Sequence, residues 1–274
     1  MPTTVITGST SGIGLEVAKQ LAKKNHDLIL VSRNLDKLKK TKSYLCKENK
    51  IKCEIHQHDL SLIRDNLLFY ENMSRKFNNI DYLINNVGAI YMKRQVTSEG
   101  LEKTFSLNHM SYFVLSKMFL KQEKPLRIIN VSSQAHRNIN LDYGDLQNRE
   151  NYNGWVAYKK SKLANIYLTY ELHKHLLKTQ STVNCLHPGV VNTNFANDNA
   201  IHYKLMASLI KYFGITPLEG ASSILYLVNN NDVKSVSGLY FNKCVPQKTS
   251  LVSYDEKCSK KLWDYSEQIL SNYI

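Results

Sequence analysis

The sequence lacks the features of secreted, metal-binding and membrane-spanning chains. Its 274 residues include five cysteines, an odd number, and no two of them form a C-x-x-C pair. Neither a disulfide framework nor a metal site is indicated, and a reducing compartment fits best. No leader precedes the first β-branched stretch, and no run reaches the ~18 apolar residues of a membrane span. We expect a cytoplasmic protein that does not cross a membrane.

Arginine is also scarce, although the chain is strongly basic. Only seven of the 36 Lys and Arg residues are Arg, and the formal net charge is +13. Such a charge raises the hypothesis of binding to nucleic acid or an anionic membrane. The lysines are scattered along helical stretches such as 34–50, and no nucleic-acid-reading motif is present. We expect a solvated lysine-rich surface without specific nucleic-acid binding.

No repeat, linker or low-complexity tract divides the chain. With 43% apolar and 22% charged residues, it has the composition of a globular protein long enough for one large core. Strand-like and helical stretches alternate, so we expect one α/β domain over residues 1–274. The predicted strands are Thr3–Thr7, Asp27–Val31, Ile51–His56, Asp81–Ile84, Leu126–Val131, Thr182–Leu186 and Gly238–Phe241.

A glycine-rich turn follows the first predicted strand. Gly8, Gly12 and Gly14 stand in the stretch GSTSGIG, and apolar residues at helical spacing come after it. Glycines at this place let the chain turn tightly and let a pyrophosphate approach the N–H groups of the helix start. The turn therefore indicates a dinucleotide-binding site, although its G-x3-G-x-G spacing differs from the G-x-G-x-x-G of other such proteins.

Polar residues end the second and third predicted strands. Where an NAD-binding unit offers an acid to the ribose 2′-hydroxyl, this chain has Ser32 and Arg33, which suit a 2′-phosphate. NADP(H) is favoured over NAD(H), unless Arg33 only begins the next helix on the surface. Asp59 either faces an adenine or caps the following helix. His56 and His58 lack further ligands at metal spacing, so no metal is expected.

Later strands and helices carry candidate catalytic side chains. Asn85 and Asn86 follow the fourth strand, and Asn108 lies inside a helical pattern expected from about residue 97 to 119, where asparagine is unfavourable. Ser133 ends the fifth strand, at the edge where open α/β sheets bind ligands, although serine there also forms turns.

Tyr158 and Lys162 are four residues apart in the predicted helix Trp155–Leu177 and therefore share a face. An ammonium ~5 Å from the phenol lowers the phenol pKa by about two, toward working pH. Taken alone, such a pair is more often solvated surface.

Three features follow the sixth strand. Pro188 and Gly189 predict a rigid turn. The apolar stretch 194–215 is either a mobile substrate lid or a buried helix. Thr216, Pro217 and Glu219 have the N-cap, N1 and N3 pattern of a helix start.

Together these motifs resemble the short-chain dehydrogenase/reductase family over essentially the whole chain. They are TGxxxGIG at Thr7–Gly14, Asn85-Asn86-Val87-Gly88, Asn108, Ser133, Tyr158-x3-Lys162 and Pro188-Gly189. Arg33, residues 108–113, the insertion before Tyr158 and His187-Pro188-Gly189 are similar to the branch with retinol dehydrogenases, the WW-domain oxidoreductase and protochlorophyllide reductase. Val87 replaces the family's usual alanine, and the N-terminal membrane anchor of several retinol dehydrogenases is missing.

The resemblance implies a single-domain Rossmann fold, a doubly wound seven-stranded parallel sheet flanked by helices. It implies that Tyr158 is the general acid/base, that Ser133 polarises the carbonyl, and that Lys162 binds the nicotinamide ribose and lowers the tyrosine pKa. Asn108 would hold a water of the proton relay. The implied cofactor contacts are Gly8, Ser11, Gly12, Ile13 and Gly14 at the pyrophosphate and ribose, Arg33 at the 2′-phosphate, Asp59 and Leu60 at the adenine, Asn86 at the adenosine-side ribose, Thr193 at the carboxamide, and Gly88, Pro188 and Gly189.

The expected function is NADP(H)-dependent interconversion of a small hydrophobic alcohol and its aldehyde or ketone. The family often forms homodimers through the long helices near 99–121 and 155–177. The alternative is a cofactor-binding, non-catalytic module for redox sensing or scaffolding, because fold does not guarantee activity. The complete set of Asn108, Ser133, Tyr158 and Lys162 argues against that alternative.

Overall fold

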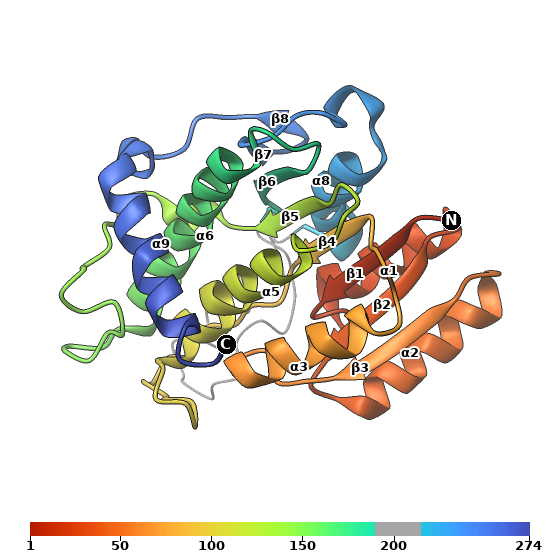
Figure 1. Ribbon diagram of the computed structural model, residues 1–274, viewed down its shortest axis with the longest axis horizontal. Coiled ribbons are helices and arrows are strands. Elements are labelled where there is room, and N and C mark those ends of the chain that lie inside the picture. The colour runs from red at the N-terminus through yellow and green to blue at the C-terminus, as the bar shows by residue number, and fades with distance from the viewer. Residues whose placement is uncertain (190–214) are drawn as a thin grey trace.

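The computed structural model describes residues 1–189 and 215–274, and their strands form one sheet in the order β3-β2-β1-β4-β5-β6-β7-β8 (Figure 1). Neighbouring strands are parallel from β3 to β7. The strand order reverses between β1 and β4, which places a ligand crevice at their carboxyl ends. The strands are β1 (Thr3–Thr7), β2 (Asp27–Ser32), β3 (Cys53–Gln57), β4 (Tyr82–Asn85), β5 (Arg127–Val131), β6 (Thr182–His187), β7 (Tyr240–Asn242) and β8 (Val245–Pro246).

The expected doubly wound parallel sheet is confirmed, with a correction at one edge. The sequence predicts seven strands, and the structure has an eighth, the two-residue β8, antiparallel to β7. Lys243 and Cys244 connect the two strands with φ of 49° and 62°. Left-handed backbone at both positions is typical of a tight hairpin turn, which usually uses Asn and Gly. The sequence therefore carries no hairpin signal at this place.

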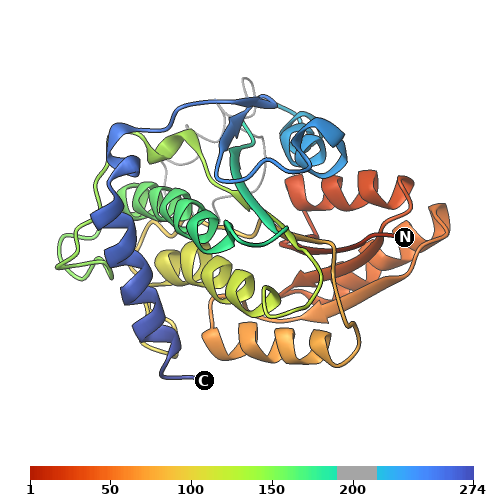
Figure 2. The same cartoon turned by 45° about the horizontal axis from the view of Figure 1, so that its top comes forward.

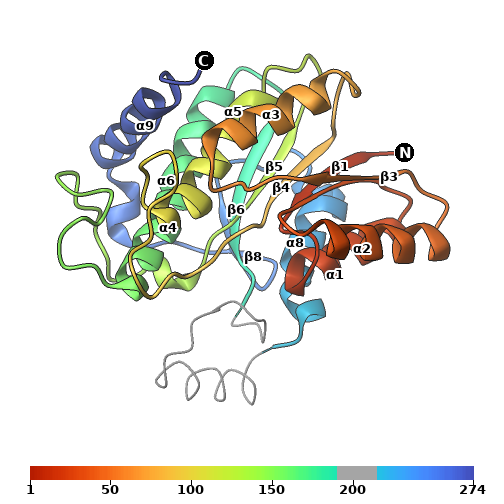
Figure 3. The same cartoon turned by 90° about the horizontal axis from the view of Figure 1, so that it is seen from below.

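Helices cover both faces of the sheet (Figures 2 and 3). One face carries α1 (Gly12–Lys23), α2 (Leu35–Glu48) and α8 (Pro217–Asn229), and the other carries α3 (Ile63–Ser74), α5 (Ser111–Phe119) and α6 (Gly154–Leu176). Alternate residues of β2 point to opposite faces: Leu28 joins the core under α1, and Ile29 joins the core under α5 and α6. Within the described ranges, no helix combines the length and apolar character needed to cross a bilayer.

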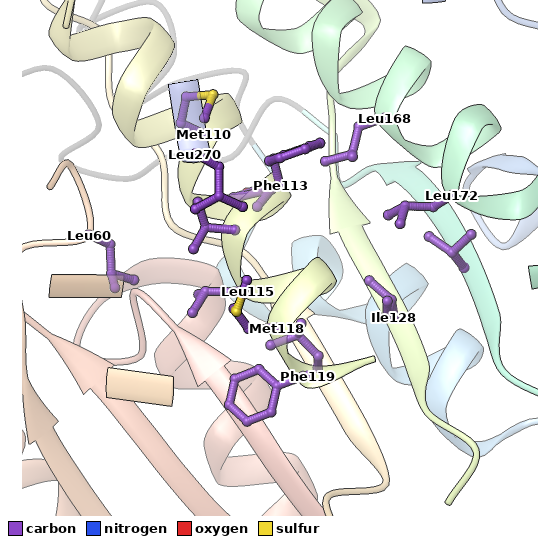
Figure 4. Packing of buried hydrophobic residues seen from close by; sticks show 14 of the residues in the cluster. Leu60, Met110, Phe113, Leu115, Met118, Phe119, Ile128, Leu168, Leu172 and Leu270 are labelled. Atoms are coloured by element: carbon purple, nitrogen blue, oxygen red, sulfur yellow. The ribbon is translucent and has the colours of Figure 1, made fainter. Parts of the chain in front are cut away.

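The larger core lies between the sheet and the helices α3, α5 and α6 (Figure 4). Phe113 of α5, Ile128 of β5 and Leu168 of α6 pack in this cluster. Leu270 of α9 (Glu256–Leu270) belongs to it too and is fully buried. The C-terminal helix is therefore part of the core on this face.

The helical pattern expected from about residue 97 begins later and is interrupted. Gly100 has a φ of 82°, and the helix begins only after Glu102, whose carboxylate accepts hydrogen bonds from the first N–H groups of α4 (Lys103–Phe105). A π-helix, η1 (Ser106–Met110), then separates α4 from α5 and contains Asn108. Such π-turns are rare and occur frequently at functional sites.

The predicted start of α8 is confirmed. The Thr216 hydroxyl oxygen accepts from the Glu219 N–H at 3.2 Å, and the Glu219 carboxylate accepts from the Thr216 N–H at 2.7 Å. Pro217 occupies the first turn. Thr193 and all but the last residue of the segment 194–215, for which we expect a lid or a buried helix, lie outside the described residues.

Candidate active site

Tyr158 and Lys162 lie on α6 at the carboxyl end of β5, where both are buried. Tyr158 is 8% exposed and Lys162 is 2% exposed. The Lys162 Nζ is 5.5 Å from the centre of the Tyr158 ring and donates a hydrogen bond to the Val131 carbonyl at 3.0 Å. Burial lowers the pKa of the Lys162 ammonium to about 7. The pair is therefore not the solvated surface that such spacing usually indicates.

Asn108 binds two parts of the chain to each other through its side chain. Its Oδ1 accepts from the Ala89 N–H at 2.9 Å, and its Nδ2 donates to the Ala89 carbonyl and to the Ser161 Oγ, both at 3.0 Å. The Ser161 hydroxyl in turn donates to the Tyr158 carbonyl at 2.7 Å. Asn108 thus joins the segment after β4 to the helix that carries Tyr158. Both Nδ2 hydrogens are used, so a relay water at this residue would bind the second lone pair of Oδ1 or the backbone.

Ser132 and Ser133 follow β5 and have different roles. The Ser132 hydroxyl donates to the Lys162 carbonyl at 2.8 Å and is buried. The Ser133 Oγ accepts from the Ala135 N–H at 3.1 Å and remains partly exposed. Because that contact uses a lone pair, the Ser133 hydroxyl hydrogen can donate to a ligand.

The glycine turn fits a pyrophosphate. Gly8 and Gly12 have φ of 68° and 52°, which other residues rarely adopt. A Cβ on Gly14 would lie 2.3 Å from the Gly8 carbonyl oxygen, so only glycine lets α1 begin this close to β1. Ser11 is the N-cap of α1 but makes no side-chain capping hydrogen bond. Ile13 packs partly buried against the core beneath the turn.

Asn86 attaches this turn to β4. Its Nδ2 donates to the Thr7 carbonyl at 2.9 Å, and the Thr7 hydroxyl oxygen accepts from the N–H groups of Asn86 and the next residue at 2.9 and 3.0 Å. A Cβ on Gly88 would lie 3.4 Å from the Asn108 Oδ1 and 3.5 Å from the Lys162 Nζ. The structure thus brings the glycine turn, the Asn-Asn motif and Lys162 to one edge of the sheet.

Arg33, Asp59 and Tyr91 gather at the ends of β2 and β3. Burial raises the pKa of the Tyr91 phenol, and the nearby Arg33 guanidinium opposes that rise while Asp59 adds to it. Arg33 is exposed, whereas the Tyr91 hydroxyl beside it is buried. An exposed guanidinium at the end of β2 fits an anionic ligand such as a 2′-phosphate.

The structure excludes one of the two roles considered for Asp59. The Asp59 carboxylate accepts from the Ser61 N–H and hydroxyl at 3.0 and 2.8 Å, which forms a local turn. The start of α3 is capped instead by Glu99. The two oxygens of the Glu99 carboxylate accept from the first two N–H groups of α3 at 2.6 and 3.0 Å. The capping role expected as one possibility for Asp59 is therefore wrong. Leu60 is buried in the core beside it.

Beyond β6, Pro188 and Gly189 are the last residues before the undescribed segment. Gly189 has a φ of 95°, and a Cβ there would lie 2.3 Å from the Ile215 side chain. The left-handed backbone agrees with the turn predicted from the sequence.

Several participating side chains are not identified by sequence reasoning. Tyr91 and Ser161 each act on a segment distant in the chain, so no local pattern marks them. Thr7 belongs to the TGxxxGIG motif, but its hydrogen bonds to the segment after β4 are not predicted from that motif. The only available signal for Ser161 is its position between Tyr158 and Lys162.

Comparison with known proteins identifies the family. A model of the short chain dehydrogenase family matches residues 2–203. The chain is 33% identical over 287 residues to retinol dehydrogenase 14 of Homo sapiens, covering 97% of this chain and 85% of the relative. It is 33% identical over 287 residues to the WW domain-containing oxidoreductase of Homo sapiens, covering 98% and 68%.

Solved structures share the fold. An uncharacterised protein from Mycobacterium paratuberculosis matches with a TM-score of 0.79 at 26% identity, over 99% of this chain and 94% of its own. A short chain dehydrogenase from Burkholderia cenocepacia, solved in complex with NADP, matches with a TM-score of 0.68 at 20% identity, over 88% and 95%.

Proposed function

The chain belongs to the short-chain dehydrogenase family, and on that premise we propose that it is an NADP(H)-dependent oxidoreductase that interconverts a hydrophobic alcohol and its aldehyde or ketone. One observation carries the proposal. The buried Lys162 ammonium lies beside the Tyr158 ring and donates to the Val131 carbonyl at the end of β5, two residues before Ser133. Asn108 of η1 donates to Ser161, which lies between Tyr158 and Lys162 on α6.

The chain's own residues handle the proton. In reduction the Tyr158 phenol donates its proton to the carbonyl oxygen, and in oxidation the phenolate takes it back from the alcohol. The adjacent Lys162 charge favours the phenolate, which lowers the tyrosine pKa toward the working range. The Ser133 hydroxyl donates to the same substrate oxygen. The nicotinamide, when bound, supplies or accepts the hydride.

We assign the cofactor to residues at the carboxyl ends of the strands, where the strand order reverses between β1 and β4. The glycine turn, from Gly8 through Ser11, Gly12 and Ile13 to Gly14, would hold the pyrophosphate. Arg33 would bind the 2′-phosphate, and it forms no ion pair within the described ranges, so its charge is available. The remaining contacts would be Asp59 and Leu60 at the adenine, Asn86 and Lys162 at the riboses, and Gly88, Pro188, Gly189 and Thr193 toward the nicotinamide.

An aromatic side chain beside the phenol supports an apolar substrate. Trp155, one turn before Tyr158 on α6, stacks on the Tyr158 ring with centres 5.6 Å apart and planes 27° apart. It is nevertheless 44% exposed. An indole that stacks on the Tyr158 ring and is partly exposed offers apolar surface to the carbon skeleton of a ligand.

The proposal is tested with a panel of alcohols, aldehydes and ketones assayed with NADPH and NADH. Tyr158→Phe should abolish turnover, and Tyr44→Phe, the same change at an exposed site on α2, should leave it unchanged. Turnover that survives in Tyr158→Phe would refute the assigned acid/base. Cofactor binding without turnover of any panel member would instead favour the non-catalytic alternative.

A further inference from the structure

His136 connects Ser133 to the C-terminal part of the chain. The ring is fully buried, its Nδ1 lies 2.6 Å from the Ser133 carbonyl oxygen, and its Nε2 lies 3.2 Å from the Ser250 backbone nitrogen. A carbonyl only accepts a hydrogen bond and a backbone N–H only donates one, so the proton sits on Nδ1 and Nε2 accepts. Its two partners thus fix the ring as one neutral tautomer.

The Ser250 end of this connection is held by α6. The Tyr167 hydroxyl donates to the Val252 carbonyl at 2.8 Å, and the Tyr170 hydroxyl is 2.8 Å from the Thr249 hydroxyl. Both tyrosines lie on the helix that carries Tyr158. The segment 249–254 is therefore hydrogen-bonded to α6 on one side. On the other side, the His136 ring links it by hydrogen bonds to the Ser133 backbone.

Other contacts at Ser133 are weaker or local. Its carbonyl also accepts the His136 backbone N–H at a longer 3.2 Å, and among the described residues its hydroxyl oxygen accepts only the Ala135 N–H two residues away. Neither contact relates Ser133 to Tyr158. The His136 imidazole links the turn after β5 to the segment 249–254, through its hydrogen bonds to the Ser133 carbonyl and the Ser250 N–H.

We propose that His136 is a positioning residue, whose ring holds the Ser133 backbone so that the Ser133 hydroxyl points at the substrate oxygen bound by Tyr158. This inference rests on the proposed function, in which Ser133 polarises the carbonyl. Orientation of this kind acts on the transition state, where a displacement of about 1 Å can cost roughly 100-fold in rate.

Two amide variants separate the two ends of the ring. In His136→Asn the amide nitrogen takes the place of Nδ1 and keeps the bond to Ser133, whereas in His136→Gln the amide reaches the place of Nε2 and keeps only the bond to Ser250. We expect kcat of the Asn variant within about threefold of wild type and kcat of the Gln variant lower by roughly 10- to 100-fold. KM and the NADPH Kd should change by less than about twofold in both.

Equal loss of kcat in the two variants, or loss that follows their melting temperatures, would show a merely structural role and overturn the proposal. A second measurement does not depend on turnover. Nitrogen-15 NMR of the wild-type imidazoles, with the His136 signal assigned from the variants, should show the neutral Nδ1–H tautomer near neutral pH. The Nε2–H tautomer would also overturn the proposal. Absence of turnover in wild type would refute the proposed function instead, and the NMR result would still decide on the ring.

Discussion

The ammonium nitrogen of Lys162 lies 5.5 Å from the centre of the Tyr158 ring in a position that is almost fully buried. No carboxylate of residues 1–189 or 215–274 pairs with this ammonium. Burial of the charge is costly and lowers its pKa to about 7. The fold therefore holds this charge beside the phenol at the expense of stability, which makes the arrangement measurable by unfolding as well as by kinetics.

Replacing Lys162 by Met should stabilise the protein at neutral pH while it abolishes turnover. The lysine pKa is about 7 when folded and 10.5 in its ordinary state, so the unfolded chain binds more protons between these values. The burial penalty is thus full below about pH 7 and fades as pH rises toward 10.5. Each pKa unit corresponds to ~1.4 kcal/mol, and the lost hydrogen bond to the Val131 carbonyl offsets part of this penalty. We expect the Met variant to gain about 1–3 kcal/mol of unfolding free energy near pH 7. Urea unfolding at two pH values measures it, and a gain that does not shrink at high pH contradicts the assignment.

Arg33→Asp should weaken NADPH binding by roughly tenfold or more and leave NADH binding nearly unchanged, because only NADPH carries the 2′-phosphate. Titration calorimetry with both cofactors measures the two affinities. Arg75→Asp, the same charge change at an exposed position of the α3 end, is the control for long-range charge. Equal weakening of both cofactors would remove Arg33 from the 2′-phosphate site.

Ser161→Ala should lower kcat/KM by roughly tenfold, because it releases Asn108 from α6 and removes the bond to the Tyr158 carbonyl. Ser116→Ala is the matched control, since Ser116 is also buried. Its hydroxyl oxygen accepts from the Asn85 amide at 3.1 Å and makes no bond to Ser161 or Tyr158 among the described residues. Both variants should lose about 1–2 kcal/mol of unfolding free energy. Steady-state kinetics with thermal unfolding tests the pair, and equal kcat/KM in the two would deny Ser161 a role at the site.

Helix α9 packs on the face of α5 and α6 through which the family often dimerises. The Trp263 ring of α9 lies 5.1 Å from the Phe113 ring and 4.5 Å from the His175 ring, and Lys117 pairs with Glu267. We therefore expect a monomer, in place of the homodimer that the family resemblance implies. Sedimentation at several concentrations measures the mass, and a dimer that forms with α9 in place would contradict this expectation.

The same packing predicts a stability difference between the two tryptophans. Trp263→Ala should cost roughly 2–4 kcal/mol, because it leaves a cavity between α9 and its neighbours. Trp155→Ala, at a position that is 44% exposed, should cost less than about 1 kcal/mol. Chemical denaturation of both variants measures the difference, and similar losses would mean that α9 is only loosely attached.

Much of the architecture follows from local sequence pattern. The central strands are short apolar runs buried on both faces, so β1 begins and ends at the predicted residues and β6 extends only one residue further. The helix capping box formed by Thr216 and Glu219 is equally local, because its donors and acceptors are three residues apart. The four-residue spacing of Tyr158 and Lys162 fixes their common face on α6 for the same reason.

The differences arise where distant segments decide the local structure. Glu99 lies near the start of the helical pattern expected from about residue 97, but it caps α3 from 36 residues away, and Gly100 turns the chain before α4 begins. The hairpin through Lys243 and Cys244 uses left-handed backbone without the residues that favour it. The network through Ser161 depends on how α6 lies against the segment after β4, which no sequence period specifies.

The placement of the two tryptophans has an optical consequence. Trp155 lies in solvent contact against Tyr158, and Trp263 lies between two rings on the far side of α6. Reduced nicotinamide absorbs where indole emits, so its binding should quench Trp155 more than Trp263. A Trp155→Phe variant would leave only the emission from α9, and a Trp263→Phe variant only the emission at the phenol. The chain thus contains separate fluorescent reporters for ligand arrival and for detachment of its last helix.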